Sequence, residues 1–306
     1  MPAAFPLPII RPTRLKSGDT LGIAAPAGPF DIDLFKQGAK VLRDMGFGLK
    51  IPEGVFLRQG FLAGTDPERA AILNSLFADA DVRGIICARG GYGSTRLEPF
   101  LDWEVIQANP KVFVGFSDIT VLHHLINSRC GLPTFHGPMV TTLANAPKIT
   151  CQAFCETLTS PASITIAAGA GRVVRPGDGA GLVAGGNLTL VCHLLGTPLQ
   201  PDFTGRILFL EEVNEAPYRI DRMLRQMQLA GCFDAVAGVV LGDFVECGDP
   251  RAIAESLDAL FASSDFPVLA GFPAGHGRVN HTLPLGIEAV LTTDPPVLRY
   301  TMAPTI

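Results

Sequence analysis

The chain has 306 residues, of which 47% are hydrophobic, and its formal net charge is −5 at pH 7. A length of this order predicts about two domains, and the scattered basic residues argue against nucleic acid as a partner. No apolar run approaches the length of about 18 residues that a membrane helix needs, so we expect no membrane partner.

The cysteines and the start of the chain bear on cellular location. The seven cysteines include no Cys-x-x-Cys pair, which indicates thiols in a reducing compartment. Residues 1–11 have neither a basic segment nor an unbroken apolar run, so a secretory leader is not expected. We therefore expect a cytoplasmic protein.

The first half of the chain alternates buried apolar runs with amphipathic stretches. In chain order the pattern predicts a strand at 20–25, helices at 31–45 and 66–80, strands at 84–88 and 112–115, and a helix at 118–129. Such alternation is typical of a parallel sheet with helices on both faces. We expect a flavodoxin-like α/β domain over residues 1–146.

The pattern loosens in the middle and then resumes. Residues 147–179 contain small residues and turn-forming sequences, which predict a connector. Beyond it we expect helices near 187–195, 218–230 and 253–262, strands at 206–210 and 236–241, and apolar runs at 268–270, 287–292 and 297–301. Residues 180–306 are therefore predicted to form a second α/β domain.

Ser117 is the candidate nucleophile. It stands between the predicted strand 112–115 and the predicted helix, and a serine at such a turn lies at the carboxyl edge of the sheet, where open α/β sheets bind ligands. Backbone N–H groups at the helix start could stabilise an oxyanion. The sequence approximates the Gly-x-Ser-x-Gly elbow, although Ile119 replaces the last glycine. The alternative is that Ser117 or Asp118 only caps the helix.

A glycine-rich turn follows the predicted strand 84–88. Its sequence, Arg89-Gly90-Gly91-Tyr92-Gly93-Ser94, permits close approach of the backbone to a ligand. Either a phosphate group or an oxyanion would suit such a turn, although it matches neither the Walker loop nor the dinucleotide fingerprint. A tight turn without a ligand is the alternative. Arg89 and Tyr92 add polar reach at the sheet edge.

A serine nucleophile needs a base and an acid that orients the base. Glu211 and Glu212 follow an apolar strand and are candidates for the acid, unless they belong to a solvated loop. His276 lies in a loop between two glycines, whereas His193 is expected to be packed in an apolar helix. The other candidate bases are His123, His124, His136 and His281. The sequence alone leaves this choice open.

Taken together, these motifs resemble the LD-carboxypeptidases, the serine peptidase family that also contains the microcin-immunity peptidases. The resemblance covers nearly the whole chain. Its motifs are residues 15–26, the glycine turn 89–93, Gly115-Phe116-Ser117-Asp118, His136-Gly137-Pro138, 185–188, 210–219 and Gly275-His276-Gly277.

The resemblance implies a catalytic triad of Ser117, Glu211 and His276, and an oxyanion hole built from the backbone N–H groups of Gly91 and Asp118. It also implies hydrolysis of the bond that joins a terminal D-alanine to murein tetrapeptides, in cell-wall recycling, by a homodimer without metal or cofactor. Glu211 is preferred to Glu212 because the family acid directly follows the apolar strand.

Three further expectations concern the substrate. Arg89, by its position, is the candidate cation for the carboxylate of the leaving D-amino acid, with Tyr92 beside it. Microcin-type members stack a nucleotide on a tryptophan in a long loop, whereas the single tryptophan here, Trp103, precedes the connector. This difference favours a murein peptide.

The remaining alternative is a non-catalytic protein that binds a small ligand.

Overall fold

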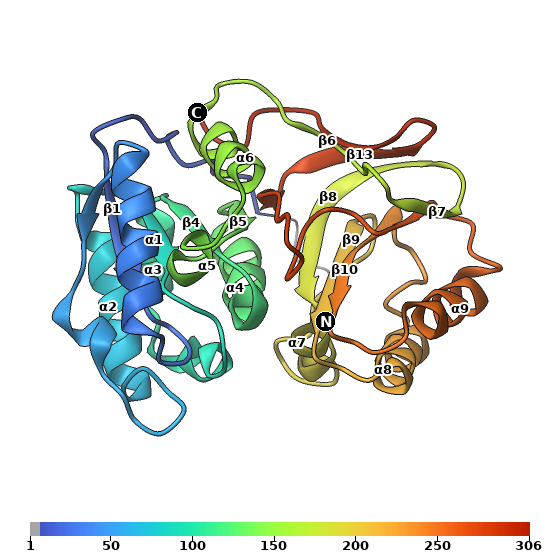
Figure 1. The fold of residues 1–306 in the computed structure, drawn as a ribbon, viewed down its shortest axis with the longest axis horizontal. Helices are drawn as coiled ribbons and strands as arrows, with labels where there is room; N and C mark the ends of the chain where they lie inside the picture. Colours follow the sequence, from blue (N-terminus) through green and yellow to red (C-terminus); the bar gives the residue numbers. More distant parts are fainter. Residues whose placement is uncertain (1–6) are drawn as a thin grey trace. The chain divides into compact units, whose positions relative to one another are not determined.

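The computed structural model describes residues 7–306, so the first six residues of the segment considered above as a leader lie outside the described part (Figure 1). The chain divides into two compact units. One contains the chain up to Pro161 with Pro284–Gly286 and Pro304–Ile306, and the other contains Ala162–Leu283 and Ile287–Ala303. Among the described residues, no helix is both long and apolar enough to span a bilayer.

The first unit is built on a six-stranded sheet. Its strands are β1 (Thr20–Ala24), β2 (Gly48–Lys50), β3 (Val82–Cys87), β4 (Val112–Gly115), β5 (Thr134–His136) and β12 (Leu283–Leu285). The order is β12-β5-β4-β3-β1-β2, and β2, β1, β3, β4 and β5 are parallel. This is the flavodoxin-like order, as predicted.

Helices cover both faces of this sheet because successive strand residues point to opposite sides. Ile86 of β3 packs in the core that contains Phe35 and Phe154, whereas its neighbour Ile85 packs in the core that contains Leu73. The first face carries α1 (Ile32–Asp44), α5 (Val140–Leu143) and α6 (Lys148–Thr159). The second face carries α2 (Asp66–Ala78), α3 (Trp103–Ala108) and α4 (Thr120–Cys130).

The end of the chain returns to the first unit. Strand β12 forms the edge of the sheet beyond β5. The Ile306 N–H donates to the Pro12 carbonyl at 3.0 Å, and the Arg14 N–H donates to the Ile306 carbonyl at 2.9 Å. The first unit therefore contains residues from both ends of the sequence.

The second unit has an eight-stranded sheet. Its strands, in sheet order, are β6 (Thr165–Ala167), β14 (Pro296–Tyr300), β13 (Glu288–Thr293), β8 (Asp178–Asn187), β9 (Ile207–Val213), β10 (Gly238–Val245), β11 (Val268–Ala270) and β7 (Arg172–Arg175). Strands β8 to β11 are parallel, and the flanking strands are antiparallel. The helices α7 (Leu188–Leu194), α8 (Pro217–Leu229) and α9 (Pro250–Phe261) share a core with β9 and β10. The predicted second α/β domain is thus present.

Several elements differ in detail from the prediction. Residues 147–179 contain α6, β6 and β7, and β8 begins within the sequence that was predicted to turn. Helix α2 begins at Asp66, as predicted, but ends at Ala78 rather than at residue 80; its N-cap is Thr65, whose hydroxyl forms a reciprocal capping box with Glu68. The division between the units falls after Pro161, inside the segment predicted as a connector.

Candidate active site

Ser117 occupies a strained turn between β4 and α4. Its φ angle is +62°, in the left-handed region, which an L-residue adopts at a cost of about 1–2 kcal/mol. A short 3₁₀ turn, Ser117–Ile119, separates the strand from the helix. The N-cap of α4 is Ile119, without a side-chain capping bond, so neither Ser117 nor Asp118 is the helix cap. Strain of this kind is typical of a nucleophile elbow.

The glycine turn after β3 lies directly against Ser117. A Cβ atom on Gly90 would lie 2.9 Å from the Ser117 Cβ and 3.1 Å from its Oγ, so a larger residue would collide with the serine. The Gly90 carbonyl accepts a hydrogen bond from the Gly28 N–H at 3.1 Å, and Gly91 has a φ of +110°. This turn follows the strand pair β1–β3, the point at which the strand order reverses and where such sheets bind ligands.

Arg89 and Tyr92, the predicted substrate-binding residues, both lie at this turn. The Arg89 guanidinium donates from Nη1 to the Pro29 carbonyl at 2.7 Å. The Tyr92 ring is 51% exposed and packs edge-on against Phe61, with ring centroids 5.3 Å apart. Both side chains therefore reach the surface from the loop that borders Ser117.

Glu211 and His276 are brought together in the second unit. Glu211 is fully buried on β9, and its Oε2 accepts from His276 Nδ1 at 2.6 Å and from the His276 backbone N–H at 3.2 Å. A Cβ on Gly275 would lie 2.8 Å from Oε2, so this approach requires glycine before the histidine. With Nδ1–H donating to the carboxylate, the neutral ring has its lone pair on Nε2, as a general base requires.

Glu212 has a different environment, although it is also buried. Its Oε1 accepts from the Asn187 side chain at 2.8 Å and from the Val213 N–H at 2.9 Å. Its Oε2 accepts from the Thr189 N–H at 2.8 Å and from the Thr189 hydroxyl at 2.7 Å. Neighbouring residues of a strand point to opposite faces, so Glu211 contacts the histidine loop while Glu212 ties β9 to the start of α7.

The other histidines have surroundings that differ from that of His276. His123 is buried, its Nε2 lies 2.8 Å from the Gly115 carbonyl oxygen, and burial lowers its pKa to about 3. His136 is buried in β5. His193, expected to be packed, is exposed on α7, because the buried face of that helix is formed by other residues. His124 and His281 are partly buried.

Sequence reasoning missed Asp243, a carboxylate beside the histidine loop. Its N–H donates to the Ala274 carbonyl at 3.2 Å, and a Cβ on Gly277 would lie 1.8 Å from the Asp243 Oδ2. Burial, and then the charge of Glu211, raise the pKa of Asp243 from 3.8 to about 6. Its position at the carboxyl end of a predicted strand was the signal that could have identified it.

The raised pKa predicts how Asp243 affects stability. Between about pH 4 and pH 6 the unfolded chain ionises at this residue before the folded protein does, so the residue lowers the free energy of unfolding as pH rises. Asp243→Asn is therefore expected to be more stable than wild type above pH 6, by up to about 3 kcal/mol. This advantage should shrink toward zero near pH 4. Urea unfolding of both proteins from pH 4 to 8 measures it, and a pH-independent difference would contradict the assignment.

Comparison with known proteins agrees with this architecture. Residues 21–137 match the model of the LD-carboxypeptidase N-terminal domain, and residues 180–291 match that of the LD-carboxypeptidase C-terminal domain. The chain is 35% identical over 293 residues to the probable murein peptide carboxypeptidase of Bacillus subtilis (strain 168), covering 92% of each chain.

Solved structures show the same similarity. Muramoyltetrapeptide carboxypeptidase from Oxalobacter formigenes matches with a TM-score of 0.82 and 32% identity, over 92% of this chain and 97% of that one. The microcin C7 self-immunity protein MccF of Escherichia coli is 30% identical over 317 residues, covering 92% of each chain. Its wild-type apo structure has a TM-score of 0.90, over 97% of this chain and 100% of that one. The chain therefore belongs to the LD-carboxypeptidase family of peptidases.

Proposed function

We propose that this protein is a serine-type LD-carboxypeptidase that removes the terminal D-alanine from murein tetrapeptides. The observation that carries the proposal is the 2.6 Å bond between Glu211 and His276, which prepares an imidazole with a basic Nε2. The strained elbow of Ser117 supplies the candidate nucleophile. Ser117, His276 and Glu211 are the proposed catalytic triad.

In the first half of the reaction, Ser117 Oγ attacks the carbonyl carbon while His276 Nε2 takes its proton. The negative charge that develops on the carbonyl oxygen is stabilised by the N–H groups of Gly91 and Asp118. The imidazolium then gives its proton to the leaving nitrogen, the C–N bond breaks, and D-alanine departs. Throughout, Glu211 orients the ring and stabilises its positive charge.

In the second half, water hydrolyses the acyl-enzyme. His276 accepts a proton from the water, whose oxygen bonds to the acyl carbon, and returns a proton to Ser117 as the ester C–O bond breaks. Arg89 is the proposed cation for the carboxylate of the leaving D-alanine, with Tyr92 as a further contact. No metal or cofactor takes part in this scheme.

The murein peptide is preferred to a microcin-type substrate, although both kinds of relative resemble the chain. Trp103, the single tryptophan of the sequence, is half-buried on α3, and the Arg129 guanidinium lies 4.7 Å from its ring centroid. The Arg129 guanidinium lies over the Trp103 ring, and this contact disfavours a role for the ring in stacking a nucleotide. We also propose that the protein acts in the cytoplasm as a homodimer, on peptides recovered during cell-wall recycling.

The proposal is tested by incubating the protein with L-Ala-γ-D-Glu-meso-diaminopimelate-D-Ala and measuring D-alanine. The tetrapeptide should release D-alanine, whereas the corresponding pentapeptide, whose last bond joins two D-residues, should remain intact. Incubation with aspartyl sulfamoyl adenosine, a compound bound by MccF, tests the microcin-type alternative. Hydrolysis of this compound, with no release of D-alanine from the tetrapeptide, would support that alternative. Binding of the tetrapeptide without release of D-alanine would instead support the non-catalytic alternative and refute the proposal.

A further inference from the structure

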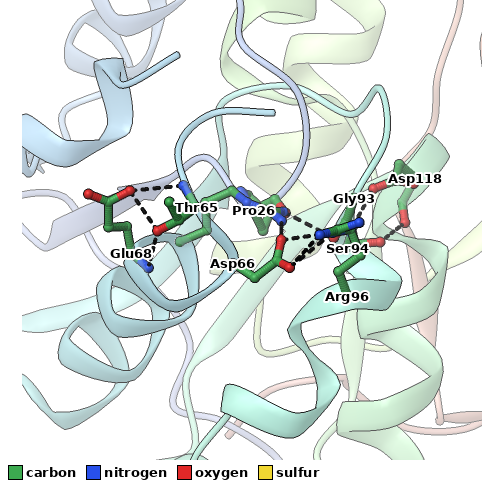
Figure 2. A network of polar contacts seen from close by, with 9 residues as sticks. Pro26, Thr65, Asp66, Glu68, Gly93, Ser94, Arg96 and Asp118 are labelled. Carbon is green, nitrogen blue, oxygen red and sulfur yellow. Dashed lines mark hydrogen bonds and ion pairs between the residues drawn. The ribbon is translucent and has the colours of Figure 1, made fainter. Parts of the chain in front are cut away.

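Asp118 links the two segments that carry the proposed oxyanion donors, through its side chain and through its backbone. The side-chain Oδ2 accepts from the Ser94 backbone N–H at 2.8 Å, and the Asp118 backbone carbonyl accepts from the Ser94 hydroxyl at 2.5 Å. Both residues are almost completely buried. Ser94 closes the glycine turn and Asp118 directly follows Ser117, so these two bonds join the turn to the elbow (Figure 2).

The buried carboxylate is supported from several sides. Burial raises the pKa of Asp118, while hydrogen bonds from Ser94 and the Gly93 backbone and the positive charge of Arg69 act in the opposite direction. Arg69 is itself 1% exposed, and its Nη1 donates to the Gly93 carbonyl at 3.0 Å and to the Pro26 carbonyl. The guanidinium therefore fixes the far side of the same turn.

The geometry at Gly90 shows why this link matters for chemistry. A Cβ on Gly90 would lie 3.4 Å from the Asp118 backbone nitrogen and 2.9 Å from the Ser117 Cβ, so the space between turn and elbow has no room for a side chain. One proposed donor, the Gly91 N–H, belongs to the turn, and the other, the Asp118 N–H, belongs to the elbow. Their separation is set by whatever holds these segments together, and a displacement of about 1 Å in such a site can lower a rate about 100-fold.

We propose that the Asp118 carboxylate is a positioning residue that clamps the glycine turn to the Ser117 elbow and thereby sets the spacing of the two oxyanion donors. This inference rests on the proposed function of Ser117 as a nucleophile. It predicts that loss of the carboxylate weakens stabilisation of the tetrahedral transition state and has little effect on binding of the substrate.

The test compares wild type with Asp118→Ala and Asp118→Asn under conditions in which each is folded. For Asp118→Ala, kcat for D-alanine release should fall about 10²-fold, with KM within about twofold of wild type. Asp118→Asn keeps an acceptor for the Ser94 N–H, so it should recover part of kcat. The rate at which a fluorophosphonate labels Ser117 should fall in parallel, because the phosphoryl oxygen also needs the donors.

Thr65→Ala is the matched control. It removes the N-cap of α2, the helix that carries Arg69, at a cost of about 1 kcal/mol, and leaves the bonds between Asp118 and Ser94 intact. It should lower stability without changing kcat or the labelling rate. Equal losses of kcat in folded Thr65→Ala and folded Asp118→Ala would mean that a general disturbance of the structure explains both and would overturn the positioning role.

The outcomes also separate this inference from the proposed function. If folded Asp118→Ala keeps the wild-type kcat and labelling rate, the clamp is refuted. If wild type is labelled at Ser117 but releases no D-alanine from the tetrapeptide, the proposed substrate fails, and the labelling rates alone decide the clamp. If wild type is not labelled at Ser117, the nucleophile and the clamp fail together.

Discussion

Ser117→Ala is expected to lower kcat for D-alanine release by about 10⁴-fold or more and to leave the free energy of unfolding close to that of wild type. The proposed acyl-enzyme cannot form without the hydroxyl, and the remaining rate would come from binding and the oxyanion donors. The backbone strain persists, because alanine also has a Cβ atom at φ +62°. Measurement of D-alanine over hours with the tetrapeptide gives the residual rate.

Ser117→Gly provides the control for that strain. Glycine adopts a positive φ without the steric penalty of an L-residue, so this variant should be as inactive as Ser117→Ala but more stable by about 1 kcal/mol. Thermal and urea unfolding of the two variants measure the difference. Appreciable activity in either variant would rule out Ser117 as the nucleophile, and equal stability would argue against strain at the elbow.

Glu211→Gln should lower mainly kcat and Glu212→Gln should lower mainly the free energy of unfolding, although the two residues are adjacent. Glutamine at 211 cannot act as the carboxylate acceptor that fixes the His276 tautomer and stabilises the imidazolium, so kcat should fall about 10³–10⁴-fold. Glutamine at 212 disrupts charge-assisted hydrogen bonds to Asn187 and Thr189, at a cost of about 2–3 kcal/mol of stability. Its folded fraction should retain kcat.

The comparison requires kcat and the free energy of unfolding for both variants. Each variant serves as the control for the other, because the substitution and the strand are the same and both side chains are buried. A loss of kcat in folded Glu212→Gln, with normal kcat in Glu211→Gln, would mean that Glu212 is the catalytic acid and that Glu211 is the structural residue. Similar losses in both would indicate that disturbance of β9 alone explains the effect.

The sequence predicted the elements in which an apolar strand leads directly into polar residues that could carry chemistry. Apolar runs ending in polar residues located β4 before Ser117 and the first part of β9, although β9 continues through Glu211 to Val213. The alternation of these runs with amphipathic stretches predicted the parallel sheet. The bond between Glu211 and His276 was not visible, because 65 residues separate them in the chain. Only the family resemblance selected that histidine.

Tertiary packing explains the elements that the sequence did not reveal. Strand β8 contains Gly179 and Gly181, which favour turns by local propensity. A Cβ on Gly179 would lie 1.8 Å from the Ala237 carbonyl oxygen, and one on Gly181 would lie 2.1 Å from that of Gly205. At both positions glycine is required because the backbone of another segment lies where a side chain would be. The local sequence does not show that this other segment is close. Strand β12, a three-residue edge strand centred on Pro284, is equally inconspicuous.

The return of the chain end to the first unit has a consequence for synthesis on the ribosome. The edge of the sheet beyond β5 is covered by β12, and Ile306 pairs with the backbone at Pro12 and Arg14. A nascent chain therefore exposes the hydrogen-bonding groups along this edge of β5 until β12, Leu283–Leu285, has been translated. Exposed strand edges promote association between chains, so this edge is open to association with other chains during the interval before β12 emerges.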